Sequence, residues 1–171
     1  TDMGGTWQRV HALEDLGMDQ TKMGHFLSIK NKGNSIWAMG GPGKFIIRSD
    51  DNGSTWTNVS VKPAYADAND IYLTSEDAAY IVEDYGEFYH TTNGGQSWTQ
   101  YNVNTNNWLT GIAVLFDYKI WVCGNAGGSF EYSVVKYSPD GGKTWNDQTP
   151  DFMKNSVGIS MYKIRMVAVY N

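Results

Sequence analysis

Two groups of charged side chains in this sequence are of types that could act on sugars. The first is a set of carboxylates, two of which could hydrolyse a glycosidic bond if held about 5–9 Å apart. The members of this set are Asp67, Asp70, Glu76, Asp77, Glu83, Asp84 and Glu87. The second is a set of three arginines that could surround the carboxylate of an acidic sugar, namely Arg9, Arg48 and Arg165.

The spacing of these residues does not favour catalysis. The carboxylates follow no pattern beyond that of a solvated acidic face. The histidines at positions 11, 25 and 90 lack the i, i+4 pairing of a zinc site. Cys123 is the only cysteine, which excludes an internal disulfide and a multi-cysteine metal site, and we expect it to be buried and inert. We therefore predict no catalytic residues, no cofactor and no metal.

Composition restricts the class of protein further. The chain has 171 residues, of which 18% are charged and 14% aromatic, and its net charge is −5. An acidic chain is a poor partner for nucleic acid phosphates. No apolar run approaches the roughly 20 residues of a membrane helix. Low charge and abundant Asn, Thr and Tyr favour an extracellular or cell-surface protein.

An internal repeat gives the architecture. The pattern S/T-x-D/N-x-G-x-T/S-W occurs in full three times, and the chain opens inside a fourth copy in which the glycine slips by one position. The tryptophans are 49, 42 and 47 residues apart, which is typical of propeller blades with four strands each. The repeat residues are Asp2, Gly4, Thr6, Trp7, Ser49, Asp51, Gly53, Thr55, Trp56, Thr91, Asn93, Gly95, Ser97, Trp98, Ser138, Asp140, Gly142, Thr144 and Trp145.

Short apolar runs between the repeats predict strands. Each run has four to eight residues, is rich in β-branched and aromatic types, and is bounded by Gly or Asn. An isoleucine marks the first run of every unit, at positions 29, 71, 112 and 159. We expect the repeated turn to be structural, with its Asp or Asn accepting backbone hydrogen bonds, its Gly adopting positive φ and its Trp buried.

The repeat resembles the Asp-box, or bacterial neuraminidase repeat. This motif occurs in sialidases, sortilin-type receptors, xyloglucan-cleaving glycosidases and the photosystem II assembly-factor family. The resemblance implies an all-β fold, a β-propeller of four-stranded antiparallel blades. It implies no particular activity, because these families share the turn and not the chemistry. The sequence lacks an Arg-Ile-Pro segment, which argues against a sialidase, and its length and few arginines argue against the photosystem branch.

The strand count predicts a small ring. We expect a single domain of four blades, at about 25–62, 68–103, 108–149, and 156–171 together with 1–13, so that the two termini share the last blade. That blade would lack one strand. Three interpretations stay open: the chain is a fragment of a larger propeller, a neighbouring molecule supplies the strand, or the blade has three strands.

The sequence thus predicts a non-catalytic module. The first hypothesis is a structural or adhesive subunit that self-associates through unpaired blade edges. The alternatives are a carbohydrate-binding propeller and a glycoside hydrolase. A ligand would bind where the blade linkers meet the loops between second and third strands, at Tyr65, Asp84, Tyr85, Trp108 and Asn125. The competing interpretation is that Tyr65 and Trp108 pack between blades.

Overall fold

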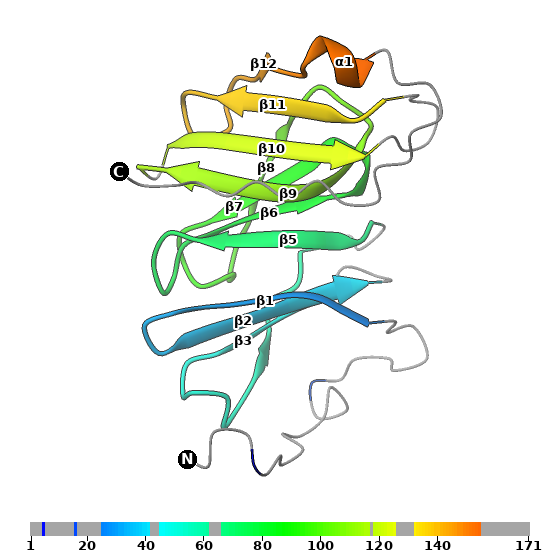
Figure 1. Ribbon diagram of the computed structural model, residues 1–171. Helices are drawn as coiled ribbons and strands as arrows, with labels where there is room; N and C mark the ends of the chain where they lie inside the picture. The colour runs from blue at the N-terminus through cyan, green and yellow to red at the C-terminus, as the bar shows by residue number, and fades with distance from the viewer. Residues whose placement is uncertain are drawn as a thin grey trace.

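The chain folds into three four-stranded antiparallel sheets (Figure 1). The structure is a computed structural model, and it describes Gly5, Leu16 and residues 25–41, 45–61, 66–116, 118–125 and 132–154. Each sheet follows the chain order of its strands, as in a propeller blade. The predicted all-β propeller with four-stranded antiparallel blades is confirmed.

The strands have the following bounds. The first blade contains β1 (His25–Lys32), β2 (Ser35–Gly41), β3 (Phe45–Ser49) and β4 (Thr57–Asn58). The second contains β5 (Ala68–Leu73), β6 (Ala79–Glu83), β7 (Glu87–Thr91) and β8 (Thr99–Asn102), with the short 3-10 helix η3 (Asp84–Gly86) between β6 and β7. The third contains β9 (Trp108–Leu115), β10 (Lys119–Asn125), β11 (Val134–Ser138) and β12 (Asn146–Asp147), followed by helix α1 (Asp151–Lys154).

The hydrophobic core lies between the blades. Alternate side chains of a strand point to opposite faces of its sheet, so β6 turns Ile81 toward the first blade and Tyr80 and Val82 toward the third. One buried cluster joins the first and second blades, and another joins the second and third. The second blade is therefore stabilised by both of its described neighbours, because its sheet buries one face against the first blade and the other against the third.

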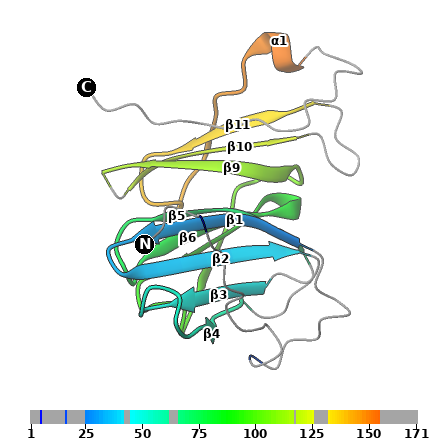
Figure 2. The same cartoon turned by 60° about the horizontal axis from the view of Figure 1, so that its bottom comes forward.

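The first strands of neighbouring blades contact one another, so β1, β5 and β9 form the inner edges of the three sheets. β5 packs against β1 on one side and β9 on the other, as Figure 2 also shows. Asp70 joins all three strands, because its carboxylate accepts hydrogen bonds from Ser28 Oγ of β1 (3.1 Å) and from the Ile112 N–H of β9 (3.4 Å). Three of the four marker isoleucines lie in these strands, and Ile159 lies outside the described residues. Ile71 and Ile112 are buried, whereas Ile29 of β1 is 63% exposed.

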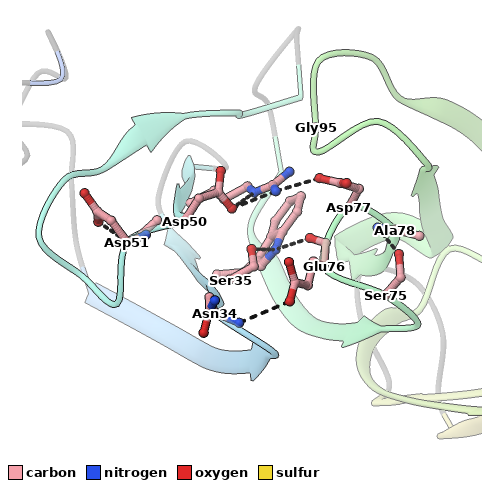
Figure 3. A network of polar contacts seen from close by, with 12 residues as sticks. Asn34, Ser35, Asp50, Asp51, Ser75, Glu76, Asp77, Ala78 and Gly95 are labelled. Atoms are coloured by element: carbon pink, nitrogen blue, oxygen red, sulfur yellow. Dashed lines mark hydrogen bonds and ion pairs between the residues drawn. The ribbon is translucent and has the colours of Figure 1, made fainter.

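Polar contacts also join the first two blades (Figure 3). The turn between β5 and β6 faces the first blade: Glu76 Oε1 accepts from the Asn34 N–H (3.2 Å), and Asp77 accepts from Arg48 Nη2 (2.6 Å). Arg48 also pairs with Asp50 (2.7 Å), and its guanidinium lies over the Trp37 ring, 5.2 Å from the centroid. Two of the candidate catalytic carboxylates, Glu76 and Asp77, thus hold neighbouring blades together.

The predicted fourth blade lies outside the described residues. Its closure from both termini stays a prediction, as do the exact blade boundaries. Within the described part of the chain, we find no helix of the length and apolar character needed to cross a membrane.

Candidate functional site

The repeated turns follow the third strand of each blade and share one geometry. In the first, the Asp51 carboxylate accepts from the Thr55 N–H (2.8 Å) and from Thr55 Oγ1 (2.7 Å). Ser49 Oγ accepts from the Gly53 N–H and donates to Asp51 Oδ1, both at 2.8 Å. The carboxylate therefore closes the turn by accepting from the residue four positions on, and the hydroxyl of Ser49 adds a second bond across it.

The third turn repeats these contacts, and the second replaces the carboxylate by an amide. Asp140 accepts from the Thr144 N–H and hydroxyl at 2.8 and 2.7 Å. In the second turn, Asn93 Oδ1 accepts from the Ser97 N–H (3.0 Å), while Asn93 Nδ2 donates to Ser97 Oγ (2.8 Å). An amide therefore fits this position, because the Ser97 hydroxyl accepts a hydrogen bond here, whereas the threonine hydroxyl donates one in the other two turns.

Because of these hydrogen bonds, we expect the first and third turns to lose stability in acid, whereas the second turn, which has Asn93 in place of an aspartate, should not. The Thr55 N–H bond lowers the pKa of Asp51, and the Thr144 N–H bond lowers the pKa of Asp140. A carboxyl group with a lowered folded-state pKa stabilises the fold above its unfolded pKa of about 3.9, and this stabilisation is lost as pH falls through the folded pKa. Replacing both residues by Asn should therefore flatten the decline of Tm between about pH 5 and 2.

Thermal denaturation followed by circular dichroism across this pH range measures the effect. Asn93→Asp is the converse variant, because it places a carboxylate in the second turn and should steepen the same decline. If Tm of the Asp51→Asn, Asp140→Asn double variant declines in acid as steeply as that of the wild-type protein, these two carboxylates do not cause the acid sensitivity.

The turns also pack against the preceding blade. Trp98 Nε1 donates to the Val59 carbonyl (2.9 Å), and the Trp98 ring lies edge-on to Trp37. Trp145 lies edge-on to Phe88, with centroids 5.3 Å apart. The turn residues of the two later blades therefore take part in the contacts between blades, which is a structural role.

The opposite end of the blades carries the predicted ligand-binding residues. We call it the linker face; it is the end at which β6 and β10 finish and β5 and β9 begin. Of the five predicted residues, Asp84 and Tyr85 lie in η3, Trp108 begins β9 and Asn125 ends β10. Trp108 and Asn125 face each other in the β9–β10 register. Tyr65 lies outside the described residues, as do Asp2, Gly4, Thr6 and Trp7 of the opening repeat.

A buried asparagine joins these segments. Asn107 is fully buried; its carbonyl accepts from the Gly86 N–H (2.9 Å), and its Nδ2 donates to the carbonyls of Asn125 (2.9 Å) and Tyr132 (2.8 Å). The sequence analysis did not identify Asn107, because one asparagine ahead of a strand is an ordinary loop residue. The one sequence feature that could have indicated it is its position directly before β9, which matches the position of Asp67 directly before β5.

Asn69 has a similar role beside η3. Its Nδ2 donates to Asp84 Oδ1 and to the Leu109 carbonyl, both at 2.9 Å. Burial raises the pKa of Asp84, and the negative charges of Asp67 and Glu87 add to this effect, while the hydrogen bond from Asn69 opposes it. Asp84 is therefore a carboxylate held in an unfavourable electrostatic environment.

Two aromatic rings on this face are exposed. Tyr85 is 56% exposed and Trp108 is 42% exposed. Trp108 is therefore not fully packed between blades. The other candidates for chemistry do not gather here: Cys123 is fully buried in β10, and the described residues contain no group of three or more His, Cys, Asp and Glu placed to hold a metal ion.

Comparison with known proteins decides the family. Residues 1–114 match the family model described as "Photosynthesis system II assembly factor YCF48". The chain belongs to this family. The YCF48 family contains Asp-box propellers, so the predicted membership of the Asp-box repeat class is confirmed.

Individual relatives agree with this assignment. The photosystem II assembly lipoprotein Ycf48 of Picosynechococcus sp. is 27% identical over 119 residues, which are 67% of this chain and 33% of the relative. The solved structure of YCF48 bound to a D1 peptide has a TM-score of 0.60 and 21% identity over 74% of this chain and 40% of that one. This chain thus spans a third of the curated relative and less than half of the solved YCF48 chain.

Propellers of another class share the fold. An ancestral GH74 enzyme has a TM-score of 0.61 and 17% identity, covering 80% of this chain and 19% of the enzyme. At this identity the likeness concerns the fold alone. The YCF48 family and the curated relative are described as assembly factors and not as enzymes, in agreement with the prediction of a non-catalytic protein.

Several functional predictions are wrong. The family match overturns the adhesive, self-associating subunit and both alternatives, the carbohydrate-binding propeller and the glycoside hydrolase. The YCF48 structure is bound to a D1 peptide, which overturns the predicted partners, a glycan or a second copy of the chain. The extracellular or cell-surface location is wrong because the relatives are photosystem II assembly factors, and low charge does not specify a compartment. The argument from length and few arginines fails because neither belongs to the repeat pattern.

Proposed function

We propose that this propeller is a non-enzymatic photosystem II assembly module that binds a peptide segment of a photosystem II subunit. The family match over residues 1–114 carries this proposal. Support comes from the solved YCF48 complex with a D1 peptide, which superposes on most of this chain. The D1 protein is therefore the first subunit to test.

The described architecture suits peptide binding. Two cores between blades hold the linker face on a rigid scaffold, and loops on such scaffolds commonly carry binding residues. The outermost strands β4, β8 and β12 have two, four and two residues, too short to pair with a long added strand. A peptide would therefore lie on a face of the propeller and not along its outer edge.

Binding of D1 peptides to the 171-residue chain tests the proposal. Overlapping, fluorescein-labelled 15-residue peptides that span D1 are titrated with the protein, and fluorescence anisotropy is measured. We expect at least one segment to bind with a Kd on the order of 10 μM, which corresponds to about 7 kcal/mol. Scrambled peptides of the same composition are the control. If no D1 segment binds more tightly than its scrambled version, the proposal is wrong.

A further inference from the structure

Tyr85 adopts a backbone conformation that tyrosine rarely takes. Its φ of 62° and ψ of 24° place it in the left-handed region, where a residue with a Cβ is strained. The side chain is 56% exposed, so burial of the ring does little to offset this strain. Strained residues of this kind are found preferentially where a side chain must be held in one place for function.

The neighbouring residues enforce this conformation. The Asp84 N–H donates to the Asp67 carbonyl (3.3 Å), and the Gly86 N–H donates to the Asn107 carbonyl (2.9 Å). Gly86 has a φ of 73°, and a Cβ on it would lie 1.9 Å from the Thr105 carbonyl oxygen. The backbone is thus fixed on both sides of Tyr85, which presents a phenol ring to solvent from a rigid turn.

Trp108 provides a second exposed aromatic ring on the linker face. It directly follows Asn107, whose carbonyl accepts from Gly86, so one hydrogen bond joins the residues next to Tyr85 and Trp108. η3 also packs against β9, the strand that Trp108 begins. The two rings therefore belong to one continuous part of the surface.

The electrostatics of this part of the surface indicate the charge of its partner. Asp84 lies beside Tyr85, and Asp67 and Glu87 surround it with negative charge. The ion pairs among the described residues involve Arg48, Lys136 and Lys154, and none of them reaches Asp84 or Asp67. A cation from a partner would relieve this repulsion and favour the ionised form of Asp84.

We propose that Tyr85, Trp108 and Asp84 bind a peptide that carries a lysine or arginine beside an apolar side chain. This inference rests on the proposed function and specifies the chemistry of its peptide. The rings supply apolar contact area and aromatic faces for the cation. The Asp84 carboxylate accepts a charge-assisted hydrogen bond from the cation.

Three substitutions test the surface without disrupting the fold. Tyr85→Gly removes the ring and relieves the positive-φ strain, so Tm should not fall while peptide affinity drops at least about tenfold. Trp108→Ala should weaken binding to a similar extent. Asp84→Asn can still accept the Asn69 hydrogen bond, and it should weaken binding of the basic peptide but not of its Lys/Arg→Gln version. Tyr118→Ala is the matched control, because Tyr118 is 49% exposed in the β9–β10 turn at the opposite end.

The binding measurement uses two peptide sets, so that this inference and the proposed function can fail separately. One set is the D1 peptides, and the other is an array of random 12-residue peptides unrelated to D1. We expect the array to select basic residues beside apolar ones, and the three variants to lose those peptides while Tyr118→Ala retains them. Such a result without D1 binding would support this surface and overturn the D1 partner. D1 binding that all three variants retain, or an array that selects no basic peptides, would overturn this inference.

Discussion

Replacing Trp145 by alanine should destabilise the protein by about 3–5 kcal/mol, the range for removing a large aromatic ring from packed surroundings. The Trp145 ring packs edge-on against the fully buried Phe88 of the second blade and belongs to the cluster that joins the second and third blades. Its Nε1 donates to the Gly142 carbonyl (2.9 Å), so the substitution also removes a bond that closes the turn. Urea denaturation followed by far-ultraviolet circular dichroism gives the free energy of unfolding.

Trp56→Ala is the matched comparison. Trp56 occupies the same place in its turn and bonds the Gly53 carbonyl in the same way (3.2 Å), but it belongs to neither inter-blade cluster of the described residues. We expect this variant to lose only about 1–2 kcal/mol, mostly from the turn bond and partial burial. Equal losses for the two variants would show that the tryptophan acts within its own turn and not between blades.

The difference between these tryptophans marks the limit of what a repeat can predict. The pattern S/T-x-D/N-x-G-x-T/S-W predicts the turn, the strand order and the four-stranded blades, because each depends on contacts within one repeat. It assigns Trp56 and Trp145 the same role. Their surroundings differ because the first blade has no described neighbour on one side, as the exposure of Ile29 also shows.

The candidate site was only partly predictable for the same reason. Asp84, Tyr85 and Trp108 were found because the meander places the loops between second and third strands and the blade linkers at one end. The roles of Asn69 and Asn107 depend on hydrogen bonds to Leu109, Asn125 and Tyr132, across strands and between blades. The left-handed backbone of Tyr85 depends on the same tertiary contacts, because nothing in the sequence Asp84-Tyr85-Gly86 requires it.

The biological role could not be derived from the repeat residues, because the Asp-box turn stabilises the fold. Asp51 and Asp140 use their carboxylate oxygens on bonds within the turn, and Asp70 and Asp77 use theirs between blades. The Asp-box motif occurs in assembly factors and in glycosidases alike, so these bonds do not distinguish the two classes.

The glycines of the turns allow the strain of positive φ to be separated from packing between blades. Gly53 and Gly142 have φ values of 90° and 94°, so alanine is strained equally at both positions, by about 1–2 kcal/mol. Among the described residues, a Cβ on Gly53 would meet only Trp56 Cζ2, at 3.8 Å, whereas a Cβ on Gly142 would lie 2.5 Å from Cε1 of the buried Phe88 ring. Phe88 is fully buried in the cluster between the second and third blades, where close packing opposes its displacement.

Gly142→Ala should therefore cost about 1–3 kcal/mol more than Gly53→Ala, because overpacking adds to the strain only at Gly142. Urea denaturation of the two variants beside the wild-type protein measures this difference directly. Truncating the obstructing ring in the Gly142→Ala, Phe88→Leu double variant should recover part of the loss relative to Phe88→Leu alone, since the two positions are in contact. If the two alanine variants unfold at the same urea concentration, the third turn does not pack against the second blade, and the arrangement of blades described above is wrong.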